Sequence, residues 1–146
     1  MTTEYKIIIN FNFASPHKSW DWCAVTDDYD GQETDPIGYG ATFVTTRSTR
    51  VATVPIGYAD GLPRRVSNRA RMLVRGRFAA LLGRVCMDTC MIDVTQIDGA
   101  SLGDEVVILG RQGDASIGPD ELGRHADTIS YEILTGLGKR VPRTYR

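Results

Sequence analysis

Residues 72–82, Met-Leu-Val-Arg-Gly-Arg-Phe-Ala-Ala-Leu-Leu, are the stretch that decides the fold class. Two short apolar runs, 72–74 and 78–82, flank the pair Arg75-Gly76. Short apolar runs on either side of a glycine turn are typical of neighbouring β-strands. The stretch therefore predicts two strands joined at Arg75-Gly76.

The same pattern continues outward from these strands in both directions. Apolar runs end at glycines, at Pro55 or at the turn Asp98-Gly99. At the start of the chain, apolar residues alternate with polar ones at the period of two expected for a half-buried strand, and the apolar members are Ile7, Ile9, Phe11 and Phe13. The further strands are predicted within 38–54, 86–94 and 105–110.

Only the last third of the chain predicts helices. Pro119 and the acids after it suit a first helical turn, and a second helix is expected through 131–134 until Gly136. Many short strands followed by short helices predict an all-β, or mainly β, fold. We expect a small Greek-key-type β-barrel with short C-terminal helices.

Composition excludes several functional classes. The chain has 146 residues, 42% of them hydrophobic, which is enough for one core, and its formal net charge of -1 favours neither nucleic acid nor a membrane surface as a partner. The start of the sequence does not resemble a signal peptide, and no apolar run approaches the ~18 residues of a membrane span. The odd count of cysteines, Cys23, Cys86 and Cys90, predicts a reduced, cytoplasmic protein.

The common catalytic and metal motifs are missing. Cys86 and Cys90 lack the close spacing of zinc ligands, so we expect no metal site. Residues 136–140, Gly-Leu-Gly-Lys-Arg, differ from a phosphate-binding loop because Arg140 replaces its Ser or Thr. Two distant histidines give little support to a nucleophile–histidine arrangement.

Two segments remain unusual. Residues 55–61, Pro-Ile-Gly-Tyr-Ala-Asp-Gly, place an aromatic hydroxyl in a glycine-flanked turn, and residues 83–88, Gly-Arg-Val-Cys-Met-Asp, place charges around an apolar stretch. Taken singly, each is better explained by packing: Tyr58 as a packing or hydrogen-bonding residue, Arg84 and Asp88 as a structural pair. Their combination with other segments is more specific.

Five segments in order resemble the alanine racemase family. They are 54–61 (VPIGYADG), 83–88 (GRVCMD), 103–106 (GDEV), 130–135 (SYEILT) and 140–145 (RVPRTY), and 38–43 (GYGATF) resembles the start of that family's C-terminal domain. The resemblance divides the chain into residues 36–146, an alanine racemase C-terminal-like β-domain, and residues 1–35, an unmatched strand and loop of divergent or foreign origin.

The resemblance implies a fragment of an isomerase. Alanine racemases join an N-terminal (β/α)₈ barrel, which carries pyridoxal phosphate on a lysine, to a β C-terminal domain, and interconvert L- and D-alanine to supply D-alanine for the cell wall. They act as dimers with active sites between subunits. The partners implied are a racemase barrel domain, a second copy in a homo-oligomer and a small amino-acid substrate. Because the barrel lysine is missing, we expect no covalently bound cofactor and no activity from this chain alone.

The family's residues map onto particular positions here. Tyr58 matches the catalytic tyrosine that acts as one of two acid/base groups, and Met87 matches a substrate-binding residue whose backbone N–H holds the carboxylate. Tyr131 matches a tyrosine that contacts the cofactor phosphate, and Arg84 and Asp88 match the entrance corridor. A tyrosine has an ordinary pKa near ~10, so Tyr58 would need cationic or hydrogen-bonding neighbours to act as a base near neutrality.

Two alternatives remain open. A nucleic-acid-binding β-barrel would use aromatic and basic residues, for which Tyr5, Phe11, Phe13 and the arginine-rich C-terminus are the support. The other alternative is an interaction module that has kept the domain fold and lost catalysis.

Overall fold

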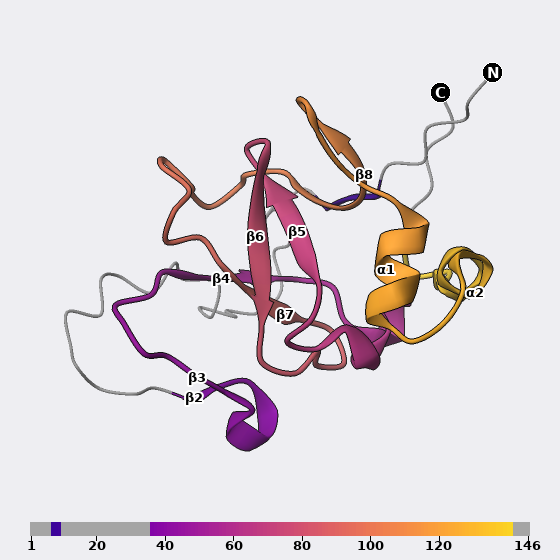
Figure 1. The fold of residues 1–146 in the computed structure, drawn as a ribbon, viewed down its shortest axis with the longest axis horizontal. Coiled ribbons are helices and arrows are strands. Elements are labelled where there is room, and N and C mark those ends of the chain that lie inside the picture. Colours follow the sequence, from indigo (N-terminus) through magenta and orange to yellow (C-terminus); the bar gives the residue numbers. More distant parts are fainter. Residues whose placement is uncertain (1–6, 10–35, 142–146) are drawn as a thin grey trace, which may run out of the picture.

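The computed structural model describes residues 7–9 and 36–141 (Figure 1). The described strands are β1 (Ile7–Ile9), β2 (Pro36–Ile37), β3 (Phe43–Val44), β4 (Val51–Val54), β5 (Arg71–Val74), β6 (Arg77–Leu82), β7 (Cys90–Asp93), β8 (Val106–Gln112) and β9 (Ala115–Ile117). The helices are η1 (Tyr39–Ala41), η2 (Tyr58–Asp60), η3 (Arg64–Val66), α1 (Pro119–His125) and α2 (Ser130–Gly136), where η marks a 3₁₀ turn. Tyr5, Phe11, Phe13, Cys23 and the arginines after residue 141 lie outside the described residues.

The central hairpin forms as the sequence predicts. β5 and β6 pair antiparallel, with Val74 opposite Arg77, so that Arg75 and Gly76 make a two-residue turn. Both turn residues have positive φ, 51° and 74°, as a type I′ hairpin turn requires. This turn suits the right-handed twist of the two strands.

The strands form a Greek key. The seven-stranded sheet has the order β1-β8-β5-β6-β7-β4, with β9 paired to β8, and all its pairs are antiparallel. β5, β6 and β7 follow one another, and β8 returns by a long connection to pair with β5. The mainly β fold with short C-terminal helices is confirmed.

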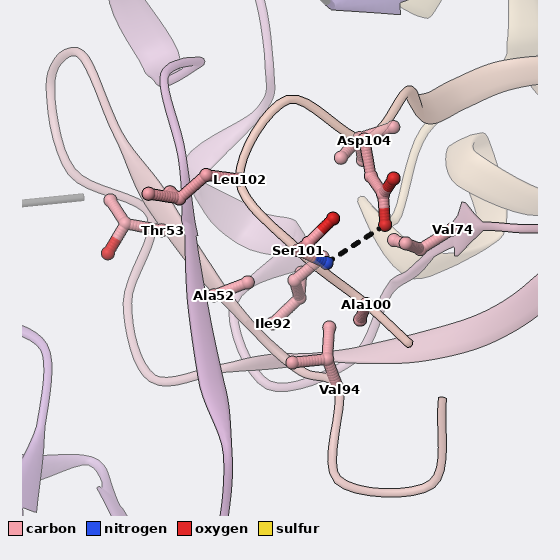
Figure 2. A pocket seen from close by; sticks show the side chains of 10 residues that line it. Ala52, Thr53, Val74, Ile92, Val94, Ala100, Ser101, Leu102 and Asp104 are labelled. Carbon is pink, nitrogen blue, oxygen red and sulfur yellow. Dashed lines mark hydrogen bonds between the residues drawn. The ribbon is translucent and has the colours of Figure 1, made fainter. Parts of the chain in front are cut away.

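The described strands do not close into a barrel, because β1 and β4 stand at opposite ends of the sheet. The connection between β7 and β8 lies beside β4, and Arg50, next to that strand, donates through Nη2 to Ala100 O at 3.0 Å. Figure 2 shows a small hollow that Ala100, Ser101 and Leu102 line together with Ala52 and Thr53 of β4. A hydrogen bond of 3.0 Å from Ser101 N to Asp104 Oδ2 holds this connection in shape.

Two predicted strands are shorter than the sequence suggested. Residues 86–89 make a turn, closed by a hydrogen bond of 2.9 Å from Cys86 N to Thr89 O, and only Cys90–Asp93 is strand. Gly38 and Gly40 have φ of 75° and 73°, which interrupts the predicted run at η1. In both places the prediction followed the apolar composition, whereas the backbone turns.

The main core cluster joins side chains of the sheet to those of the β7–β8 connection and of the two α-helices. Ile92 of β7 is fully buried, and Leu122 of α1 and Ile133 of α2 join the same cluster. The helices pack against each other at one side of the sheet (Figure 1). None of the helices described is long and apolar enough to cross a membrane. Within the same residues, no group of His, Cys, Asp and Glu could hold a metal ion.

Candidate functional site

The turn after β4 carries Tyr58 and is closed by its own hydrogen bonds. Gly57 N donates to Asp60 Oδ2 at 2.9 Å, and Asp60 N donates back to Gly57 O at 3.1 Å. Gly61, with φ of 109°, ends the turn in a left-handed conformation that glycine adopts without strain. Asp60 is buried, whereas the side chain of Tyr58 stays 44% exposed. The turn therefore presents the phenol at the surface.

A second loop, 86–88, lies directly against this turn. Tyr58 N donates to Cys86 O and Ala59 N donates to Met87 O, both at 3.0 Å. A Cβ added at Gly57 would lie only 2.2 Å from Met87 O, so the two backbones approach closely because residue 57 has no side chain. Met87 is 53% exposed. The fold thus brings the predicted residues Tyr58 and Met87 together.

Asp88 has a partner that the sequence analysis did not assign. Arg140 Nη2 donates to Asp88 Oδ1 at 2.7 Å, and Arg140 Nε forms an ion pair with Asp60 Oδ1 at 3.4 Å. The hydrogen bond to Asp88 and the charge of Asp60 raise the pKa of Arg140 above its ordinary value. Asp60 and Arg140 are therefore candidate site residues that sequence reasoning missed. For Asp60 a local signal existed, since an acid three residues after Gly57 can cap the turn.

Arg84 lies on the other side of the 83–88 segment. A Cβ added at Gly38 would lie 3.1 Å from Arg84 N, and one at Gly40 would lie 3.7 Å from Arg84 Cζ. Arg84 is exposed, and the structure packs it beside η1. Val85 next to it is buried, and its N–H donates to Ser67 Oγ at 2.9 Å. Asp88 forms its ion pair with Arg140 and not with Arg84, so the expected structural pair of Arg84 and Asp88 is wrong.

Tyr131 projects from α2 and is 74% exposed. The C-terminal end of this helix packs on the Tyr58 turn, since a Cβ added at Gly61 would lie 2.3 Å from Gly136 O. Tyr58, Met87 and Tyr131 are thus exposed on three segments, of which the Tyr58 turn contacts both the 86–88 loop and the C-terminal end of α2. Backbone contacts hold these segments in place, so the arrangement does not depend on contacts between the three side chains.

The hollow in Figure 2 is not part of this arrangement. It is lined mainly by apolar side chains of β4, β5, β7 and the 100–106 segment, and its volume is about 30 Å³. Sites for small molecules usually enclose several hundred Å³. We therefore take the exposed surface around Tyr58 as the candidate site. A larger hollow of about 330 Å³, lined in part by Gly61 and Gly136, lies beside the Tyr58 turn.

Comparison with known proteins decides the family. A sequence profile described as "Alanine racemase, C-terminal domain" matches residues 24–145. The chain belongs to this family. The profile begins upstream of Pro36, where the motif resemblance starts, and the division of the chain at residue 36 stays a prediction.

Individual alanine racemases agree with the profile. The enzyme from Halothermothrix orenii is 54% identical over 110 residues, which are 75% of this chain and 29% of the relative. The biosynthetic alanine racemase from Pseudomonas aeruginosa superposes with a TM-score of 0.71 at 41% identity, covering 77% of this chain and 30% of that one. The alanine racemase from Bartonella henselae, solved with covalently bound pyridoxal phosphate, gives 0.72 at 36% identity, covering 77% and 31%. The chain thus spans less than a third of the length of these relatives.

Proposed function

We propose that this chain is the C-terminal domain of an alanine racemase and donates Tyr58 as a proton-transferring group to an active site completed by a barrel domain. The observation that carries the proposal is the half-exposed phenol of Tyr58 on a turn that is fixed by backbone hydrogen bonds. Rigid placement supports catalysis, because a misplaced acid or base loses much of its effect. The membership in the alanine racemase family supplies the reaction.

Racemisation sets a geometric requirement that Tyr58 suits. A proton must leave one face of the substrate Cα and another must arrive on the opposite face, so one group is needed on each side. The phenol oxygen of Tyr58 would give or take the proton on one face. The group on the other face would come from the barrel domain, as the chain spans less than a third of its relatives. A placed acid or base contributes roughly 10²–10⁴ in rate.

The cofactor proposed for the complete enzyme is pyridoxal phosphate. When bound, it disperses the negative charge left on Cα after a proton is removed. The exposed donors of this chain fit an anionic cofactor and a carboxylate substrate held by another domain: the hydroxyls of Tyr58 and Tyr131, the Arg84 guanidinium and the backbone N–H of Met87. We expect Tyr131 to reach the cofactor phosphate, and Arg84 and Asp88 to line the entrance. Lys139 is the only lysine among the described residues, and we propose that the cofactor is not covalently attached to it.

The same proposal covers partners and location. The exposure of Tyr58 suits an active site shared with a barrel domain and a second subunit. We accordingly propose a homo-oligomer in the complete enzyme, in the cytoplasm. Tyr58 is 44% exposed and is therefore accessible to such a partner.

A chimera tests this function. Residues 24–145 of this chain replace the matching part of the Halothermothrix orenii alanine racemase, and turnover of L-alanine to D-alanine is measured with pyridoxal phosphate present. We expect turnover that falls by at least roughly 100-fold in Tyr58→Phe. The 146-residue chain alone should neither racemise alanine nor retain pyridoxal phosphate after borohydride reduction. Full activity of Tyr58→Phe would refute the role of Tyr58.

A further inference from the structure

The segment that begins at the last residue of α2 contacts both loops of the candidate site. We call residues 136–140 the C-terminal strap. Gly138 N donates to Asp60 O at 2.8 Å, and a Cβ added at Gly138 would lie 3.2 Å from that same oxygen. The strap therefore lies directly on the turn that carries Tyr58. It comes from a part of the chain distant in sequence from both loops.

One side chain of the strap reaches both loops. Arg140 contacts Asp60, on the Tyr58 turn, through Nε and contacts Asp88, next to Met87, through Nη2. Asp60 is fully engaged, because its second carboxylate oxygen accepts the hydrogen bond from Gly57 N. Arginine presents several donors in a rigid planar fork, so it can hold two carboxylates at a fixed separation. A lysine has a single ammonium group on a flexible stem.

The exposure of the Arg140–Asp88 pair argues for a geometric role, whereas the Asp60 side chain at the other end of the bridge is only 12% exposed. The side chains of Arg140 and Asp88 are 56% and 55% exposed. Exposed ion pairs contribute little to the free energy of unfolding. Arg140 nevertheless connects two loops that otherwise meet through the hydrogen bonds of Tyr58 N and Ala59 N. Its main effect is therefore expected on the relative placement of the loops.

We propose that Arg140 is a positioning residue, which fixes the Tyr58 turn relative to the Met87 loop by bridging Asp60 and Asp88. The inference rests on the proposed function of Tyr58 for its catalytic consequence. Its physical content, a link between two loops, holds for the chain itself. The two parts can be tested separately.

Amide hydrogen exchange of the full chain tests the link. In Arg140→Met, we expect the amides of Tyr58 and Ala59 to exchange at least about tenfold faster, while amides of β5 and β6 keep their rates. Arg69→Met is the matched control, because Arg69 is also exposed and pairs with an exposed aspartate, Asp127, at 2.8 Å. It should leave Tyr58 and Ala59 unchanged.

Two results would overturn the proposal. Unchanged exchange at Tyr58 and Ala59 would show that Arg140 does not hold the turn. Equal acceleration of all amides, including those of β5 and β6, would show a general effect on stability. Arg140→Lys separates charge from geometry, since it keeps the charge but cannot span both carboxylates, and we expect it to resemble Arg140→Met.

The chimera tests the catalytic consequence. A misplaced Tyr58 should lower kcat by roughly 10- to 100-fold and change KM for alanine less, since Arg140 contacts the loops and is not proposed to contact substrate. Wild-type kcat in an active chimera that depends on Tyr58 would refute positioning by Arg140. A chimera that does not depend on Tyr58 would refute the proposed function instead, and hydrogen exchange would still decide whether Arg140 links the loops.

Discussion

Replacing Gly57 by alanine tests the close approach on which the candidate site is built. Gly57 has φ of -143° and ψ of -165°, an extended conformation that alanine also adopts. The substitution therefore adds one methyl group without backbone strain at residue 57. That methyl carbon would lie 2.2 Å from Met87 O and 2.3 Å from Cys86 O.

The expected magnitude follows from these distances. An ordinary contact for such a carbon is 3.4 Å or more, so the turn and the loop must separate by about 1 Å. Hydrogen bonds of 3.0 Å from Tyr58 N and Ala59 N would then be lost or badly weakened. Overpacking of this kind costs about 1–3 kcal/mol. A catalytic group misplaced by ~1 Å loses roughly 100-fold in rate.

Urea unfolding of the chain, followed by circular dichroism, measures the stability, and kcat/KM of the chimera measures the catalytic effect. We expect Gly57→Ala to lower the free energy of unfolding by about 2 kcal/mol and the turnover by roughly 100-fold. Gly118→Ala is the matched control. Gly118 is also extended, with φ of -92°, and a Cβ there meets nothing within 4 Å. The control should change stability by less than ~1 kcal/mol.

A Gly57→Ala variant with the stability and turnover of the Gly118→Ala control would refute the reasoning. The turn and the 86–88 loop would then be free to separate, and residue 57 would need no glycine. Loss of turnover with unchanged stability would contradict the packing cost but not the importance of placement.

Three other predictions concern the scaffold. The hydrogen bond from Arg71 lowers the pKa of Glu121 below 4.5, so its contribution to stability is complete above pH 4.5 and is lost as the pH falls through the lower folded-state pKa; acid unfolding of Glu121→Gln should therefore show a weaker pH dependence there. Burial raises the pKa of the Cys90 thiol, so iodoacetamide at pH 8 should modify Cys90 in urea and spare it in the folded chain, and equal labelling would contradict its burial. Ile92 is fully buried in β7, and Ile92→Ala should cost about 3 kcal/mol in urea unfolding, whereas a cost below ~1 kcal/mol would mean that Ile92 is not a core residue.

The sequence alone determined the features that depend on neighbouring residues. The pair Arg75-Gly76 between two apolar runs was enough to predict the β5–β6 hairpin, since turn conformation is a local property. Pro119 and the acids after it likewise predicted the start of α1. The ordered motifs around Tyr58, Met87 and Tyr131 predicted the family, which the profile match confirmed.

Only the tertiary structure decided which of these segments meet. No local signal predicts that β8 pairs with β5, that the β7–β8 connection lies beside β4, or that Arg140 lies between Asp60 and Asp88. The pattern of residues in a sequence predicts the backbone conformation of short segments. An ion pair between residues distant in sequence depends instead on where the packed core places their backbones. For that reason the motif alone predicts Tyr58, whereas the contact of the C-terminal strap with the Tyr58 turn depends on the tertiary structure.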